Sequence, residues 1–138
     1  MIRYFDASAL VKRYVREAGS SVVRHLLQES AAATSRLSEV EIASALARRC
    51  REGAITLSER DRALVAIRRD FPSLYVVELS AEICDATYDL LMRHRLRAGD
   101  AIQLASCIHL QKKVGAPVRF IAYDARLTDV ARGEGLTL

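Results

Sequence analysis

The chain has 138 residues with 21 basic and 17 acidic side chains, a formal net charge of +4, and 51% hydrophobic residues. This length accommodates one domain, and the apolar content excludes a disordered or low-complexity chain. Every apolar run is shorter than the roughly 18 residues of a membrane span, and Asp6 comes too early for the apolar core of a signal peptide. We therefore expect a single globular domain over residues 1–138, cytoplasmic and without membrane association.

Three widely spaced cysteines, Cys50, Cys84 and Cys107, form no CxxC pair that would indicate a zinc site or a redox dithiol. We expect them to be small buried residues of a reducing compartment. The pI of about 9.2 is a modest basic bias, compatible with a polyanionic partner but common among ordinary proteins. Composition alone therefore leaves the function open.

Short apolar segments and helical periodicities alternate along the first half of the chain. A strand is predicted at 2–5, and apolar residues at helical spacing follow at 8–19. Ser20 is suited to cap a second helix. A second strand is expected at 31–34 and a long helix at 35–51.

The second half continues the alternation. Ser58 is predicted to cap a helix that ends before Pro72. Strands then follow at 74–79 and 119–123, and helices at 81–93, 99–113 and 124–133. This order predicts an α/β domain around a mostly parallel sheet, with ligands beyond the carboxyl ends of the strands.

Two aspartates come directly after predicted strands, Asp6 after 2–5 and Asp124 after 119–123. Both carboxylates should therefore emerge at the carboxyl edge of the sheet. Each is equally suited to be the N-cap of the helix that follows it.

Two more acids are placed on helices. Glu41 shares a stripe with Leu37 and Val40 that should turn inward, and Asp100 precedes Leu104 on another apolar face. The alternatives are an exposed Glu41 in a shifted register and an Asp100 that merely complements the helix dipole. Carboxylates converging from four places would repel one another unless a divalent cation neutralised them. Oxygen donors of this kind suit Mg²⁺ or Mn²⁺.

The four acids lie in order within the segments YFDASALVK at 4–12, EIASAL at 41–46, LRAGDAIQLA at 96–105 and IAYDARL at 121–127. Together these segments resemble the PIN-domain family and, more narrowly, the VapC-type toxins of bacterial toxin–antitoxin pairs. The resemblance runs over the whole chain; the segment at 96–105 matches best and that at 41–46 most loosely.

The resemblance implies a three-layer α/β/α sandwich and a Mg²⁺-dependent endoribonuclease, with Mn²⁺ as a possible substitute, that cleaves RNA, forms a homodimer and is inhibited by a cognate antitoxin. By position it assigns catalysis and metal binding to the family's four acids, here Asp6, Glu41, Asp100 and Asp124. Ser8 stands where the family places a hydroxyl residue, although it is equally suited to cap a helix. Tyr123 replaces a residue that is small in many relatives, and its ring is expected to narrow the pocket.

Basic residues cluster at 12–16, 48–51, 93–97 and 112–113. Such runs are usually solvated helix faces. The group at 93–97 is the better candidate for phosphate or antitoxin contacts because it leads into Asp100.

Three other functions fit parts of the pattern. A DNA- or structure-specific nuclease would use the same acids, and a catalytically silent module would keep only the fold. A phospho-receiver domain would need a pair of adjacent acids after the first strand, where this chain has Asp6 alone.

Overall fold

Four short parallel strands occupy the centre of the computed structural model, which describes residues 1–138. They are β1 (Arg3–Phe5), β2 (Ala32–Ser35), β3 (Tyr75–Val77) and β4 (Arg119–Ile121). Their order is β3-β2-β1-β4, and every pairing is parallel. All four carboxyl ends therefore meet at one edge, where β1 and β4 are neighbours.

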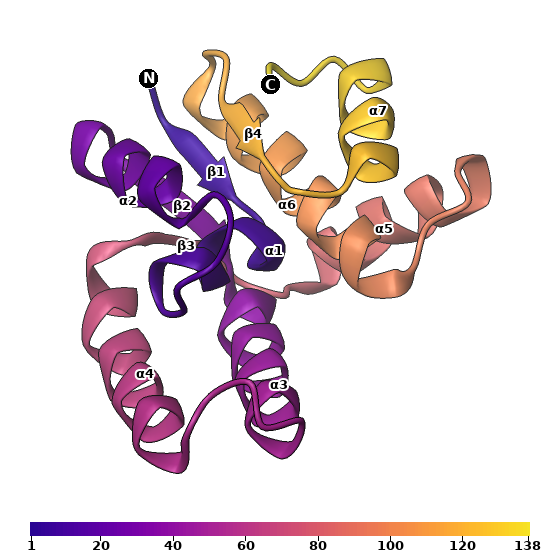
Figure 1. Ribbon diagram of the computed structural model, residues 1–138. Helices are drawn as coiled ribbons and strands as arrows, with labels where there is room; N and C mark the ends of the chain where they lie inside the picture. Colours follow the sequence, from indigo (N-terminus) through magenta and orange to yellow (C-terminus); the bar gives the residue numbers. More distant parts are fainter.

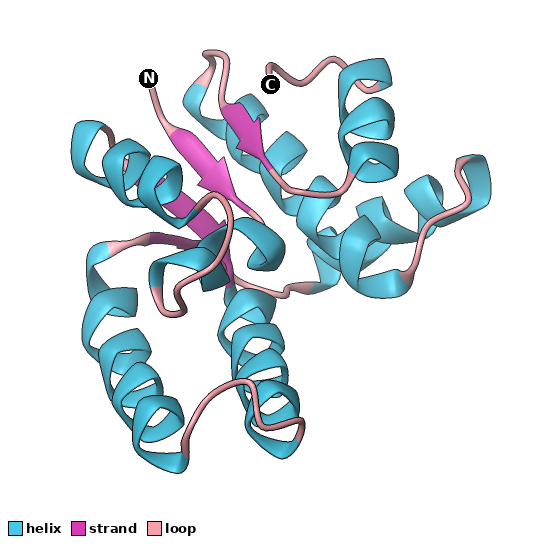
Figure 2. Cartoon of the chain, in the orientation of Figure 1, coloured by secondary structure: helices cyan, strands magenta, loops and turns pink.

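Seven α-helices surround the sheet (Figure 2). They are α1 (Ala7–Leu10), α2 (Ser20–Glu29), α3 (Arg36–Arg51), α4 (Leu57–Asp70), α5 (Ala81–Arg93), α6 (Ala98–Val114) and α7 (Ala125–Gly133). Two short 3-10 helices, η1 (Val11–Arg13) and η2 (Phe71–Ser73), extend α1 and α4. In Figure 1, α3 and α4 form a pair that projects beyond the sheet, while α5, α6 and α7 lie on the other side.

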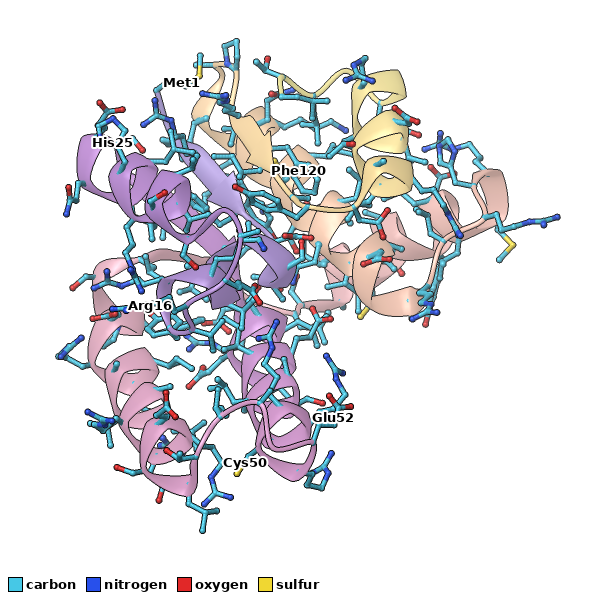
Figure 3. All side chains as sticks on the ribbon, in the orientation of Figure 1. Met1, Arg16, His25, Cys50, Glu52 and Phe120 are labelled. Atoms are coloured by element: carbon cyan, nitrogen blue, oxygen red, sulfur yellow. The ribbon has the colours of Figure 1, made fainter.

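The strands bury both faces because successive side chains point to opposite sides of the sheet. Tyr4 and Phe120 stack at 5.8 Å between ring centroids and belong to a core shared with α5, α6 and α7. Phe5 and Ile121, one residue further along, join a second core built from the first four helices. Figure 3 shows Phe120 in the interior, whereas Cys50 lies at the projecting end of α3. The predicted three-layer α/β/α sandwich is confirmed.

The helix expected at 8–19 is wrong in its extent, because regular helix stops at Arg13. The Ser20 hydroxyl donates to the carbonyl of Val15 at 2.9 Å and accepts from the N–H of Glu17 at 3.0 Å. These bonds close residues 14–19 into a loop before α2. Gly19 rather than Ser20 is the N-cap of α2.

Two smaller expectations were also wrong. Thr56 rather than Ser58 caps α4, in a capping box with Glu59. Of the cysteines, only Cys107 is fully buried, and all three thiols are free. No helix is long and apolar enough to cross a bilayer.

Candidate active site

Asp6 sits at the carboxyl end of β1, where it caps α1 with one of its two carboxylate oxygens. Its Oδ1 accepts hydrogen bonds from the N–H of Ala9 at 2.9 Å and from the Ser8 hydroxyl at 2.7 Å, whereas Oδ2 accepts none. The residue is only 3% exposed. Burial, together with the charges of Asp100 and Glu41, raises its pKa to about 7 despite these two bonds. Asp6 therefore caps a helix, and its carboxyl has a pKa close to neutral pH.

Asp124 lies beyond β4 but not directly after it, because the strand ends at Ile121 and is shorter than the predicted 119–123. Its Oδ1 caps α7 by accepting from the N–H groups of Arg126 at 2.9 Å and Leu127 at 3.1 Å, and Oδ2 again accepts none. Unlike Asp6, it is exposed. The capping interpretation is thus correct for both aspartates, and it leaves one oxygen of each available to a ligand.

Glu41 reaches the same edge from α3, but not along the stripe that the sequence suggested. Helix α3 buries Ser38, Ile42 and Leu46, while Val40 is 66% exposed, so the predicted inward stripe is wrong. Glu41 is half-buried because it faces a cleft rather than the core. Its Oε1 accepts from Nε2 of Gln103 at 2.9 Å. Burial raises its pKa, and the charge of Asp100 adds to the effect.

Asp100 lies in the first turn of α6, on the same helix face as the buried Leu104 and Cys107, as predicted. Burial and the charge of Asp124 raise its pKa, while the guanidinium groups of Arg97 and Arg126 oppose the rise.

Each of the four predicted acids therefore lies within electrostatic range of at least one other. They do not form a closed cage, because no three Asp, Glu, His or Cys side chains are grouped closely enough to hold a metal ion.

A buried polar network beneath these acids was missed at the sequence level. Gln103 is its centre: it accepts from the Tyr4 hydroxyl at 2.7 Å and donates to the Ser38 hydroxyl and to Glu41, each at 2.9 Å. The available signal was a lone polar residue among the inward-facing positions of α6, three residues after Asp100.

Gly99 was also missed as a site residue. A Cβ at this position would lie 3.0 Å from Oε2 of Glu41. The absence of a side chain therefore lets the Glu41 carboxylate approach the amino end of α6, where the helix dipole favours negative charge.

A cleft of about 690 Å³ opens beside Glu41, which is the only one of the four acids that lines it. Ser8 and Glu41 line it together with Lys12, Arg48 and Tyr123. Ser8 is not a helix cap, so the capping alternative for it is wrong. Its hydroxyl links Asp6 to the backbone N–H of Tyr123 at 3.0 Å.

The basic group at 93–97 divides into two parts. Arg93 and His94 are bound to Glu134 near the end of α7, and Arg93 also pairs with Asp89. Arg97 instead lies near Asp100, whose pKa it lowers. Only Arg97 of these residues is thus placed beside the acids.

The donor set fits a hard divalent cation. All four acids offer oxygen alone, and two of them keep an oxygen without a hydrogen bond. Burial raises the pKa of Asp6, Glu41 and Asp100, and the charges of neighbouring acids add to the rise. Mg²⁺ and Mn²⁺ prefer oxygen ligands, and either would relieve this repulsion.

Comparison with known proteins agrees with this geometry. The chain is 37% identical to Ribonuclease VapC45 of Mycobacterium tuberculosis (strain CDC 1551 / Oshkosh) over 96% of its own length and 90% of that protein. It is equally similar to Ribonuclease VapC49 of strain ATCC 25618 / H37Rv, and 33% identical to Ribonuclease VapC46 over 98% and 94% of the two chains.

The fold is also that of a solved relative. The crystal structure of Mycobacterium tuberculosis VapC20, described as a sarcin-ricin loop cleaving toxin, superposes with a TM-score of 0.71 at 20% identity, covering 94% of this chain and 95% of that one. The PIN domain model matches residues 3–133. The chain therefore belongs to the PIN-domain family, within its VapC group.

Proposed function

We propose that this protein is a Mg²⁺-dependent endoribonuclease, active also with Mn²⁺, that serves as the toxin of a toxin–antitoxin pair. The observation that carries the proposal is the meeting of Asp6, Glu41, Asp100 and Asp124 at one sheet edge, in a chain 37% identical to proteins named ribonucleases. The same edge supports a nuclease rather than a silent module, because it retains all four acids despite their repulsion.

The chain's own residues would divide the work of phosphodiester hydrolysis. Asp6, Asp100 and Asp124 would hold the metal directly or through bound water, since the side chains do not form a closed cage. The metal would stabilise charge on the phosphate and lower the pKa of bound water. Glu41, with its raised pKa and its Oε1 fixed by Gln103, is suited to orient the attacking water and accept its proton. Arg48 in the cleft and Arg97 beside Asp100 are placed to bind flanking phosphates.

The proposal includes a homodimer, a cytoplasmic location and inhibition by a cognate antitoxin. Tyr88 and Met92, one turn apart on the outer face of α5, are exposed and supply apolar surface for a protein partner. Size-exclusion chromatography with light scattering tests the dimer. Co-expression with a short neighbouring open reading frame that encodes a DNA-binding protein tests the antitoxin, which should copurify and suppress cleavage.

The deciding experiment is cleavage of a labelled single-stranded RNA by the purified protein with and without Mg²⁺. Asp6→Asn should reduce the rate about a hundredfold or more, and EDTA should abolish it. Asp129→Asn is the matched control, since this aspartate is exposed on α7 and pairs only with Arg132.

Three results would reject the assignment: equal activity of Asp6→Asn, activity that resists EDTA, or cleavage of a DNA strand of the same sequence in preference to RNA. Absence of both cleavage and Mg²⁺ binding by calorimetry would indicate a silent module instead.

A further inference from the structure

Tyr123 is a half-exposed aromatic ring at the rim of the proposed catalytic cleft. It lies just beyond Ala122, the residue that follows β4, precedes Asp124, and is 46% exposed. It lines the same cleft as Ser8 and Glu41. A half-exposed aromatic ring beside a polar cleft adds little to the core and is accessible to a ligand in that cleft.

The backbone of Tyr123 is fixed relative to the acids. Its N–H donates to the Ser8 hydroxyl at 3.0 Å, and that hydroxyl donates to Oδ1 of Asp6 at 2.7 Å. The backbone of Tyr123 is therefore linked, through the side chain of Ser8, to the carboxylate of Asp6, which we assign to catalysis.

Two neighbours hold the ring of Tyr123. Lys12 Nζ lies 4.4 Å from the ring centroid, and it donates to the carbonyl of Ala18 at 2.8 Å. Gly19, with φ +89°, packs so closely that a Cβ there would lie 3.0 Å from Cε1 of Tyr123. The ring is therefore held in place by two contacts, while 46% of the residue stays exposed to solvent.

A half-exposed aromatic ring beside cations matches the chemistry of an unpaired nucleotide. Nucleobases stack on such faces, while Lys and Arg neutralise the phosphates on either side. Arg48 is exposed on the same cleft, and Arg49 lines it while paired with Glu17. A purely apolar partner would not match a rim with these charges.

We propose that Tyr123 is a stacking platform for an unpaired RNA base next to the scissile phosphate, and thereby a determinant of substrate affinity. The inference rests on the proposed function for the identity of the ligand.

The test measures stacking separately from cleavage. Single-stranded oligoribonucleotides carrying 2-aminopurine at successive positions are titrated in EDTA, and the quenching of the probe reports stacking. Wild type should quench one position strongly. Tyr123→Ala should lose that quenching and bind about tenfold more weakly, whereas Tyr123→Phe should retain both because it keeps the ring. With Mg²⁺, Tyr123→Ala should raise KM and leave kcat nearly unchanged.

Tyr75→Ala is the matched control. Tyr75 is 51% exposed but borders a different cavity, with Lys113, so its removal should change neither quenching nor KM. Unchanged binding and quenching in Tyr123→Ala, an equal loss in Tyr123→Phe, or no position quenched by wild type would overturn the proposal. Quenching that depends on Tyr123, without any RNA cleavage by wild type, would support stacking and reject the nuclease. RNA cleavage by wild type, with the same KM in Tyr123→Ala, would support the nuclease and reject stacking.

Discussion

Asp6 shows most directly how a functional side chain weakens the fold that carries it. Because its pKa in the folded chain is about 7, the protonated carboxyl supports folding fully below its ordinary pKa of 3.8, and that contribution is lost as the pH rises through about 7. At pH 8, the buried carboxylate faces the charges of Glu41 and Asp100 without compensation.

Asp6→Asn should therefore stabilise the metal-free protein at pH 8, by roughly 3 kcal/mol, and change it little at pH 4. The amide oxygen can still accept the hydrogen bonds of Ala9 and Ser8, so the cap is preserved. Thermal unfolding in EDTA at both pH values measures the effect, with Asp129→Asn as the control. A lower melting temperature for Asp6→Asn at pH 8 would contradict the burial and repulsion described for this carboxyl.

Sequence reasoning succeeded with residues whose position depends on one element and failed with those that depend on several. Asp6 and Asp124 follow strands, and that alone places them at the sheet edge. Gln103 could not be assigned a role, because its partners Tyr4 and Ser38 come from β1 and α3. The surroundings of the Tyr123 ring could not be predicted, because the loop at 14–19 carries the carbonyl that holds Lys12 over the ring and leads to Gly19 beside it.

The amino end of α6 leaves room for the side chain of Glu41 from α3. Alanine favours a helix over glycine by up to about 1 kcal/mol, yet Gly99 occupies the first turn. The flexible carboxylate of Glu41, rather than backbone, is the group that an added Cβ would displace. A substitution there should act on the site and spare the fold.

Gly99→Ala should leave the melting temperature unchanged or slightly higher and reduce RNA cleavage about ten- to hundredfold, because Glu41 shifts from its position. Gly133→Ala in α7 is the matched control: a Cβ there meets nothing within 4 Å, so activity should be retained. Thermal unfolding and single-turnover cleavage measure the two effects. Full activity of Gly99→Ala would show that the close approach of Glu41 to α6 is not needed.

A local cap predicts the start of α5 correctly but that of α4 incorrectly, and near the first acid a loop decides where the helix ends. Ser80 caps α5 as expected from its side chain alone. Near the first acid, the bonds of Ser20 to Val15 and Glu17 close a loop that no helical periodicity reveals. The shortened helix has a functional consequence, since that loop carries the carbonyl of Ala18 that holds Lys12 over Tyr123.

At the scale of the molecule, the order β3-β2-β1-β4 brings the two strand-end aspartates side by side, and the layers bring the other two acids toward them. Glu41 comes from α3 on one face of the sheet and Asp100 from α6 on the other. The alternation of strands and helices predicts the layers, but not which strands become neighbours, because that depends on the packing of the whole chain.

The net charge of +4 averages an acidic centre and a basic rim, so binding of RNA should depend steeply on salt. Arg48 and Arg97 lie on that rim from α3 and from the start of α6, so each should neutralise one phosphate. Replacing either by Ala should reduce the slope of log K against log salt by about 0.7 and weaken binding of all sequences alike.

Arg132→Ala, which removes a surface ion pair with Asp129, should leave the slope unchanged. Fluorescence anisotropy between 50 and 200 mM KCl, on the order of the physiological range, gives these slopes. Equal slopes for all four proteins would place the RNA backbone elsewhere on the surface.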